Sequence, residues 1–562
     1  MKQLKKLYTF IFLLFVGFSI QAEDVLLKIL KDELNYQFTQ MRRSQPDLYY
    51  MDFHVTDQKS FSASASFGAE NQNSRTHVRN FVPALRIGNK NFDNQIDPRQ
   101  TAVAPGPGRG IILASLPIEN DPVAIRQVIW NETFVKYKRA IDDLQRATDE
   151  SRISLEMSDT TPSFSAAPVV VHYEPILTGP KIEFDEEMWT QRMKNVSAVF
   201  ARHREFLTGN ASVSFRIRRT YFVNTEGSSV VQNLTYAQIS IGAMLRAEDG
   251  MELPLHASFF AFFPNDLPSE AELIAAAEDL VERLLVMRTA PLVSPFTGPA
   301  LLSGAASGVF FHEIFGHRIE GQKMKSDRDG QTFKRMVGEY VLPSALSVFD
   351  DPTMRQYRGS DLNGFYIFDD QGVRGERVTV VEDGILRNFL MTRTPIDGFL
   401  RSTGHGRAEM GFDPDSRQSN LIIETSEPKS DDELRRLLIE EARAQGREFG
   451  YFFRRVSGGF TQTGARTINA FNVTPLEVYR IYVDGRPDVM VRGVDLIGTP
   501  LSMFSRITYA GKPETAEIFI GRCGAGSGWV PVTAISPTIL VRQVEVQSKA
   551  RTTDREPILP RP

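Results

Sequence analysis

Two histidines and a glutamate stand close together in an otherwise apolar stretch of the chain. Residues 310–322 read FFHEIFGHRIEGQ, so Glu313 directly follows His312, and His317 lies five residues after His312. Neutral imidazoles are common zinc ligands, and a carboxylate beside the first ligand can take a proton from metal-bound water. The stretch predicts a hydrolytic metal site with Glu313 as general base. The alternative is two unrelated histidines on a buried helix.

The spacing of these histidines differs from the common H-E-x-x-H pattern, whose histidines are four apart on one helix face. In a regular helix, residues five apart diverge by about 140°. We therefore expect a widened, π-type turn between His312 and His317, which Gly316 is flexible enough to allow. Unbroken α-helical bonding over 309–320, with the imidazoles splayed apart, would contradict this expectation.

A catalytic zinc usually takes three protein ligands and keeps one open position. One candidate for the third ligand is Glu320, three residues beyond His317. The other is Cys523, the only cysteine of the chain, in the glycine-flanked stretch GRCGAG. Thiolate is a strong zinc ligand, but an inert buried cysteine is equally consistent with the sequence. A single cysteine also excludes an intramolecular disulfide.

The composition is that of an ordinary globular protein. The chain has 562 residues, of which 41% are hydrophobic and 24% charged, with a net charge of −4. It carries no basic excess, so we expect no nucleic-acid partner. Helical spacing and caps predict helices over 25–41, 121–148, 187–203, 269–287 and 430–446, and alternating patterns predict strands over 49–87 and 213–263. Turn signals at Asp383-Gly384 and Asp484-Gly485 predict hairpins. The expected fold class is α+β, with predominantly antiparallel sheets and flanking helices.

The first 22 residues have the layout of a signal peptide: three lysines, an uncharged run over Leu7–Ile20, and Ala22 as a small residue for cleavage. We therefore expect export to the periplasm or secretion. A second uncharged run, Pro291–Phe311, is interrupted by prolines and should form a loop, a strand and the start of a buried helix. The mature chain is thus expected to lack a membrane span. The predicted parts are a signal peptide (1–22), an α+β region for peptide or partner binding (23–290), a catalytic domain (291–547) and a polar tail (548–562).

The segment HEIFGHRIEG resembles the signature of the TldD/PmbA family of metalloproteases. Further similarities are Gly404–Glu409 (GHGRAE), Ser419-Asn420, Cys523-Gly524, Val530–Val532 and Pro537-Thr538. Together they cover roughly residues 290–545, whereas Gln322 and His405 depart from the family pattern. The resemblance implies a two-part architecture and a zinc ion held by His312, His317 and Cys523, with Glu313 as catalytic base. It also implies a member of the catalytic type, working as a homodimer or as a heterodimer with a related subunit. The signal-peptide layout makes it an exported member, in contrast to the best-known cytoplasmic ones.

The resulting hypothesis is a zinc metallopeptidase that hydrolyses unfolded or extended peptides. Such a peptide could add as a strand along a sheet edge, where Gly458 and Gly459 allow backbone to approach backbone. Arg407 and Asn420 are further candidates for substrate binding, or else members of a turn-stabilising network. Two other functions stay open: a non-catalytic assembly subunit, and a zinc amidohydrolase acting on cell-wall peptides.

Overall fold

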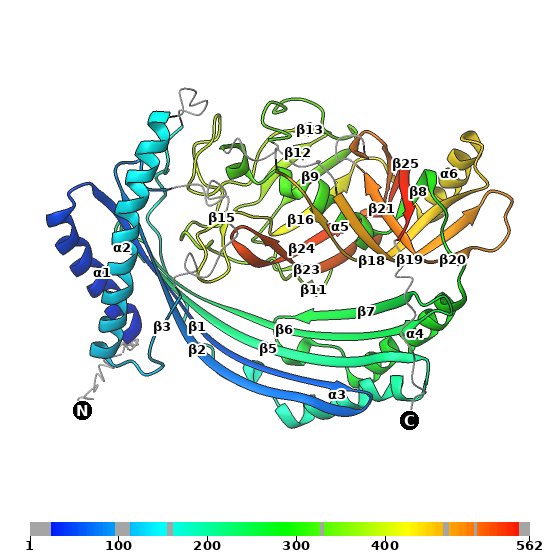
Figure 1. The fold of residues 1–562 in the computed structure, drawn as a ribbon, viewed down its shortest axis with the longest axis horizontal. Helices are drawn as coiled ribbons and strands as arrows, with labels where there is room; N and C mark the ends of the chain where they lie inside the picture. The colour runs from blue at the N-terminus through cyan, green and yellow to red at the C-terminus, as the bar shows by residue number, and fades with distance from the viewer. Residues whose placement is uncertain are drawn as a thin grey trace, which may run out of the picture.

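The computed structural model describes residues 24–95, 113–153, 161–325, 331–464, 471–498 and 503–549. Over these ranges the chain has the predicted α+β class, with three large sheets of mostly antiparallel strands and a few flanking helices (Figure 1). The expected signal peptide, Met1–Ala22, and all but the first two residues of the predicted tail lie outside the described residues.

The first half of the chain builds one long curved sheet, with strand order β3-β2-β1-β5-β6-β4 and β7 added to β6. Its two longest hairpins, β1–β2 and β5–β6, are antiparallel throughout, and only the short β4 runs parallel to its neighbour. The strands are β1 (Leu48–Ser66), β2 (Ala69–Ile87), β3 (Ala114–Ser115), β4 (Val171–Tyr173), β5 (Phe206–Asn224), β6 (Ser229–Arg246) and β7 (Glu252–Ala261).

The two faces of this sheet differ because side chains alternate along each strand. On β5, Val213, Phe215 and Tyr221 belong to apolar clusters on the convex face. That face is covered by four helices, with α1 and α2 at one end and α3 and α4 at the other (Figure 1). The intervening residues, such as Ser214 and Arg216, face the second half of the chain. The helices are α1 (Val25–Ser44), α2 (Pro122–Ile153), α3 (Glu186–Ala201) and α4 (Glu270–Thr289).

The second half lies over the concave face of the first sheet and contains two sheets of its own (Figure 1). One has the order β13-β12-β9-β16-β24-β23, and the other β17-β22-β25-β21-β19-β18-β8, with β20 on β19. The strands of the six-stranded sheet are β9 (Leu346–Asp350), β12 (Val378–Glu382), β13 (Ile385–Leu386), β16 (Asn420–Thr425), β23 (Glu517–Ala525) and β24 (Gly528–Ser536). The strands of the larger sheet are β8 (Phe296–Leu302), β17 (Pro428–Lys429), β18 (Phe449–Thr461), β19 (Phe471–Tyr482), β20 (Val489–Val491), β21 (Val494–Gly498), β22 (Ile507–Gly511) and β25 (Ile539–Ser548).

Helix α5 (Gly304–Ile314) packs against strands of both sheets, including β18, β23 and β24. Its apolar side chains belong to the largest core cluster of the described residues. The amphipathic helix α6 (Asp431–Ala444) lies at the periphery and buries Leu434, Leu438 and Ala442. Short elements connect these parts: two-stranded pairs at β10 (Gln356–Tyr357) with β11 (Ser360–Asp361) and at β14 (Gly406–Arg407) with β15 (Asp415–Ser416), and 3-10 turns at Pro180–Ile182, Pro264–Asp266, Gly316–Arg318, Gly321–Lys325 and Pro513–Thr515.

Most predicted elements are confirmed, with small shifts at their ends. The helix expected over 121–148 begins at Pro122 and continues to Ile153. The uncharged run 291–311 forms strand β8 and most of α5, as expected. Both Asp-Gly turns join paired strands, β12 to β13 and β19 to β20. Within the described residues, no helix is long and apolar enough to cross a membrane.

The caps predicted at residues 269 and 430 are both capping boxes in the structure, and the one on α6 is open to a direct test. The Ser430 side chain accepts a hydrogen bond from the Glu433 amide, while the Glu433 carboxylate accepts one from the Ser430 amide. Loss of an N-cap hydroxyl costs about 1 kcal/mol. We expect Ser430→Ala to speed hydrogen exchange of the α6 amides about fivefold, and Ser430→Asp, which keeps a cap acceptor, to leave it near the wild-type rate. Equal exchange in all three proteins would contradict this.

Candidate metal centre

Helix α5 reaches the candidate site because it lies unusually close to the β23–β24 hairpin. The Ser303 side chain caps the helix by accepting a hydrogen bond from the Ala306 amide. A Cβ atom on Gly304 would stand 2.4 Å from the Ser536 carbonyl oxygen, and one on Gly308 would stand 3.1 Å from the Ala534 Cβ. Residues four apart share a helix face. His312 therefore follows Gly304 and Gly308 on the face that lies over this hairpin.

The predicted π-type turn between the two histidines is wrong. The α-helix ends at Ile314, and after Phe315 the chain enters a 3-10 turn over Gly316–Arg318, which is tighter than an α-turn. The change of direction at Phe315 brings the two imidazoles together all the same, with ring centroids 5.1 Å apart. Arg318 stabilises the helix end by donating hydrogen bonds to the carbonyl oxygens of Glu313 and Ile314.

Gly316 is required here by packing rather than by backbone conformation. A Cβ atom at this position would stand 1.9 Å from the Gln418 side-chain oxygen. The Gln418 amide nitrogen lies 3.4 Å from the His312 carbonyl oxygen, so this side chain contacts both the helix end and the turn. The absence of a side chain at 316 lets the turn close against Gln418, and this closure positions His317.

The structure brings His312, His317 and Cys523 together at one point. Their ligand atoms all lie within 4.8 Å of one another, and all three side chains are buried. The Cys523 Sγ is 3.3 Å from His317 Nε2. The Glu313 carboxylate lies 4.0 Å from the same nitrogen. Two imidazoles, a thiol and a neighbouring carboxylate thus meet across more than 200 residues of sequence.

Glu320 is not a fourth member of this group but a partner of His317. Its carboxylate lies 3.2 Å from His317 Nδ1, the ring nitrogen that faces away from Cys523. It is fully buried and forms an ion pair of 2.6 Å with Lys323, with Arg417 at 3.7 Å on its other oxygen. A carboxylate on the second nitrogen of a ligating histidine fixes the tautomer and orientation of the ring. Of the two candidates for third ligand, the geometry favours Cys523.

The charges around the cluster favour a thiolate. Burial opposes ionisation of Cys523, but the neighbouring His317 and Arg417 outweigh it and lower the pKa of the thiol. Arg417 also donates a hydrogen bond to the Cys523 carbonyl oxygen. Burial lowers the pKa of His312 and thus favours neutral imidazole, the form that binds metals. Burial also tends to raise the pKa of Glu320, but Lys323 and His317 hold it well below its usual range.

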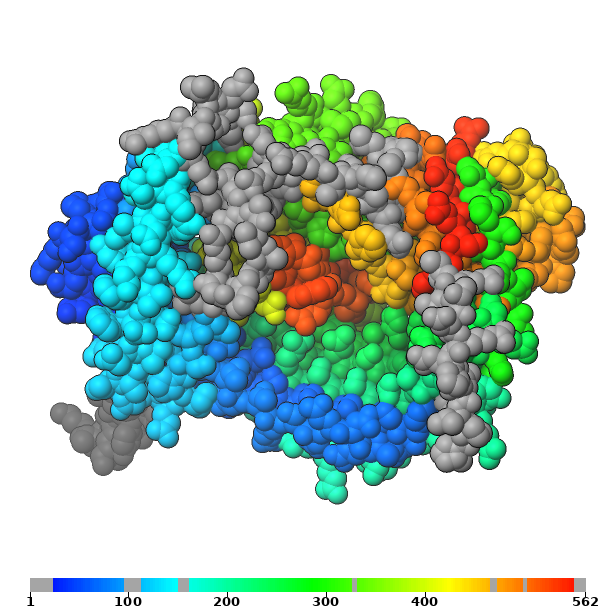
Figure 2. All heavy atoms as spheres, viewed as in Figure 1, coloured from blue at the N-terminus to red at the C-terminus, as the bar shows by residue number. Residues whose placement is uncertain are grey.

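Glu313 borders a groove that runs between the two halves of the molecule. The groove has a volume of about 1260 Å³, and His312 and Glu313 line it together with residues of β7, β18 and β23. Figure 2 shows this hollow between the orange β23–β24 hairpin and the green strands of the first sheet. Burial raises the pKa of the Glu313 carboxyl. The His-His-Cys cluster is therefore buried in the protein but borders the groove through His312 and Glu313.

The other residues singled out in the sequence divide into two groups. Gly458 and Gly459, on β18, line the groove together with His312 and Glu313. Arg407 and Asn420 do not: each is buried and donates to backbone carbonyl oxygens, Arg407 to Gln418 and Asn420 to Asp351 and Met354. Their contacts are those of the turn-stabilising network.

His405 lies outside the cluster as well. Its ring is fully buried between Thr403 and the Asp350 carboxylate, which is 3.1 Å away. The sequence reasoning missed Lys323 and Arg417, the two cations that hold Glu320 in its ionised form. A weak signal existed for Lys323, which follows Glu320 by three residues, but none existed for Arg417, whose neighbours come from distant strands.

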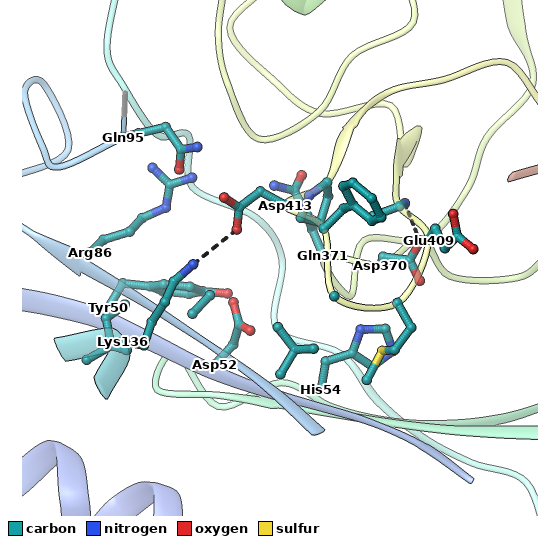
Figure 3. Close-up of a pocket in the computed structure, with 18 of the residues that line it drawn as sticks. Tyr50, Asp52, His54, Arg86, Gln95, Lys136, Asp370, Gln371, Glu409 and Asp413 are labelled. Atoms are coloured by element: carbon teal, nitrogen blue, oxygen red, sulfur yellow. Dashed lines mark hydrogen bonds and ion pairs between the residues drawn. The ribbon is translucent and has the colours of Figure 1, made fainter. Parts of the chain in front are cut away.

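A second, smaller cavity of about 130 Å³ lies where β1, α2 and residues 408–414 meet. Figure 3 shows Lys136 of α2 pointing across it to Asp413, at 3.4 Å, with Asp52 and His54 of β1 along one wall. Burial raises the pKa of Asp52 to about 7, although Tyr50 and Arg86 act in the opposite direction. This cavity contains none of the candidate metal ligands.

Fold and site together define a class: an α+β protein with a buried His-His-Cys cluster beside a glutamate at a groove. Residues 296–548 match the PmbA/TldA metallopeptidase C-terminal domain. A metalloprotease of Archaeoglobus fulgidus is 30% identical over 244 residues, which are 43% of this chain and 51% of the relative. The metalloprotease TldD homolog of Buchnera aphidicola (subsp. Acyrthosiphon pisum) is 24% identical over 440 residues, or 75% of this chain and 86% of the relative.

The fold also has relatives among solved structures. TldE from Thermococcus kodakarensis superposes with a TM-score of 0.60 at 14% identity, covering 93% of this chain and all of that one. At this identity the likeness concerns the fold alone. The second half of the chain is thus similar to the C-terminal domain of PmbA/TldA metallopeptidases, and the curated relatives that the chain matches are named metalloproteases.

The contacts of Glu320 predict a graded effect on metal binding. Glu320→Gln removes the charge that orients His317 but leaves all three candidate ligands in place. Loss of such a supporting contact typically lowers metal affinity 10–100-fold. We expect a decrease of about that size in a titration against a competing chelator, with Glu382→Gln, an exposed site in the same half of the chain, as control. Unchanged affinity in Glu320→Gln would show that the carboxylate does not support the site.

The partly buried Asp52 predicts a pH-dependent stability. Its folded pKa of about 7 lies above its ordinary value of 3.8, so the folded protein keeps a proton that the unfolded chain releases between these values. The contribution of Asp52 to stability is therefore present at low pH and lost as the pH rises through about 7. We expect Asp52→Asn to raise the melting temperature at pH 8 by about 1–2 °C per kcal/mol gained and to change it little at pH 4. A gain that is larger at pH 4 would contradict the assignment.

Proposed function

We propose that the chain is a zinc-dependent metallopeptidase of the PmbA/TldD family that hydrolyses unfolded or extended peptides. The observation that carries the proposal is the meeting of His312, His317 and Cys523 beside Glu313, at the wall of a groove. The names of the curated relatives point to the same chemistry.

The donor set fits zinc. In a tetrahedral site with bonds of about 2.3 Å to sulfur and 2.0–2.1 Å to nitrogen, ligand atoms lie about 3.3–3.6 Å apart. The Cys523 Sγ–His317 Nε2 separation of 3.3 Å is close to the sulfur–nitrogen value of about 3.6 Å. The other ligand atoms lie within 4.8 Å of one another, so modest side-chain movements would bring them to such separations. Two imidazoles and a thiolate are a ligand combination known from catalytic zinc sites. Zinc bound here would lower the pKa of a coordinated water to about 7 and polarise a peptide carbonyl.

Glu313 supplies the proton transfers in this proposal. Its carboxylate lies beside the ligand cluster, 4.0 Å from His317 Nε2, and burial raises the pKa of its carboxyl above the ordinary value. A carboxylate at hydrogen-bond reach of the attacking water can act as general base and then as general acid. We infer that it accepts a proton from the attacking water and delivers it to the leaving amine.

Free strand edges beside the cluster support an extended substrate. In the described sheets, β23 pairs only with β24, and beyond Phe453 strand β18 no longer pairs with β8. Both strands line the groove. A peptide that adds as a strand to such an edge gains backbone hydrogen bonds with little dependence on its sequence. Gly458 and Gly459 offer no side chains to obstruct that approach.

The location and the oligomeric state of the protein are each proposed from one observation. Export to the periplasm or secretion rests on the layout of Met1–Ala22. Pairing as a homodimer, or as a heterodimer with a related subunit, rests on the resemblance to the TldD/PmbA family. Mass measurement of the native protein after purification from the cell envelope or the medium tests both.

The Glu313→Gln variant tests the proposed chemistry. It removes the base and keeps every candidate ligand, so we expect full zinc occupancy and a loss of peptide hydrolysis of about 10²–10⁴-fold. Zinc is measured by mass spectrometry of the purified protein, and hydrolysis on an unfolded protein in parallel with cell-wall peptides.

Glu424→Gln, at an exposed site, serves as the matched control. Hydrolysis at the wild-type rate by Glu313→Gln would exclude Glu313 as the base. Zinc-loaded wild-type protein that cleaves neither substrate would favour a non-catalytic subunit, and cleavage of cell-wall peptides alone would favour an amidohydrolase.

A further inference from the structure

Three arginines gather beside the groove, where the first sheet meets the β23–β24 hairpin. Arg216 and Arg218 stand on the concave face of the first sheet, and Arg522 projects from β23 in the second half. Burial lowers the pKa of Arg216, and the positive charges of Arg218 and Arg522 lower it further, so the three guanidinium groups lie within electrostatic reach of one another. Arg218 and Arg522 line the same cavity, of about 240 Å³.

These three guanidinium groups have no direct carboxylate partner: among the ion pairs of the described residues, none joins Arg216, Arg218 or Arg522 to a carboxylate. Arg218 donates only to the amide oxygen of Gln58, at 3.3 Å, and the buried Nε of Arg216 has no hydrogen-bond partner. The ring of Tyr236 lies 5.5 Å from the Arg216 guanidinium and 6.0 Å from that of Arg218.

The acidic side chains that line this cavity are Asp369, Asp370 and Glu409. Each accepts hydrogen bonds from backbone amides: Asp369 from Gln371, Val373 and Gly406, Asp370 from Ala408, and Glu409 from Trp529. Like charges that share a partly buried site repel one another. The three arginines therefore keep hydrogen-bond donors and positive charge that favour the binding of an anion.

Strand β23 connects the three arginines to the metal ligands. Arg522 and Cys523 are consecutive on β23, so their side chains point to opposite faces of the sheet. Arg522 and Trp529 line both the large groove, which contains His312 and Glu313, and the cavity of the arginines. The two spaces therefore meet at the free edge of β23, and a peptide paired along that edge presents alternate side chains to each.

We propose that Arg216, Arg218 and Arg522 form a subsite that binds a carboxylate of the peptide substrate. The carboxylate is either an Asp or Glu side chain or the C-terminal group of the peptide. Guanidinium groups bind carboxylates through paired, charge-assisted hydrogen bonds. Because Arg522 directly precedes Cys523 on β23, the carboxylate would belong to a residue close to the cleaved bond in the peptide. The inference rests on the proposed peptidase function and adds a preference for acidic or C-terminal segments.

The test measures binding separately from hydrolysis. The zinc-loaded full chain carrying Glu313→Gln is titrated by calorimetry with three unstructured peptides of about 12 residues. The first has one central Glu and an amidated C-terminus, and the second has Gln in place of this Glu and is also amidated. The third has the Gln sequence and a free C-terminal carboxylate. We expect at least one of the two carboxylate-bearing peptides to bind about 10-fold more tightly than the amidated Gln twin. The preference should weaken as salt is raised.

Arginine substitutions then test whether the three arginines cause this binding preference. Arg216→Gln with Arg218→Gln should reduce it to below twofold, and so should Arg522→Gln alone, an exposed change that tests the subsite without altering the first sheet. Arg202→Gln with Arg204→Gln removes the same charge at the same spacing from the exposed end of α3 and should leave the preference intact. Equal binding of all three peptides in the parent protein, or a preference that survives both sets of arginine substitutions, would overturn the subsite.

Digestion of the same peptides by the unsubstituted, zinc-loaded protein separates the two proposals. Hydrolysis without any preference for a carboxylate overturns the subsite and leaves the peptidase. Charge-selective binding with no hydrolysis of any peptide leaves the subsite and overturns the peptidase. The arm that shows the preference, central Glu or free C-terminus, identifies the source of the carboxylate.

Discussion

The contact on which the site depends is the position of the His317 ring between Cys523 and Glu320. One ring nitrogen faces the Cys523 sulfur at 3.3 Å and the other faces the Glu320 carboxylate at 3.2 Å. A buried carboxylate is costly unless it is paired, and here Lys323 and Arg417 supply the compensating charge. Arg417 also holds the Cys523 carbonyl oxygen. The same buried ion group therefore fixes the histidine and the strand that carries the thiol, and neither can move independently of the other.

The second constraint is the close packing of α5, which is possible because glycines stand at the points of closest contact. Gly304 and Gly308 let the helix lie on β24, and Gly316 lets the following turn close on Gln418. In a close-packed interior even one added methyl group must displace its neighbours. The three glycines thus allow close packing of α5 and the following turn, and this packing places the last turn of the helix beside β23. The spacing of the two histidines makes sense only with the break at Phe315, which ends the helix between them.

The local features of the fold could be predicted from the sequence, but the way distant segments meet could not. Hydrophobic spacing, capping boxes and Asp-Gly turns located helices and hairpins to within a few residues. The donor set of His312, His317 and Cys523 came from residue types and a family resemblance. The turn between the histidines was predicted wrongly, because an argument from helical periodicity assumes that the helix continues to His317. In the structure the helix ends before His317, where Gln418 packs closely and Arg318 donates hydrogen bonds to the last carbonyl oxygens. Arg417 and the arginine cluster depend on strands far apart in the chain, and no local pattern encodes them.

The chemistry of the first sheet follows from the same alternation that builds its core. Its convex face must be apolar because four helices cover it, so the concave face is left to serine, threonine, glutamine and arginine side chains such as Arg216 and Arg218. The wall opposite the metal cluster is formed by β7, which contributes the polar His256 and Ser258 and the apolar Phe259 and Phe260. A peptide bound in the proposed way would therefore meet apolar as well as polar side chains, and burial of its own apolar side chains would add affinity. Backbone pairing at the free edge of β23 would supply the part of the affinity that does not depend on sequence, and the three arginines would add a preference for a carboxylate.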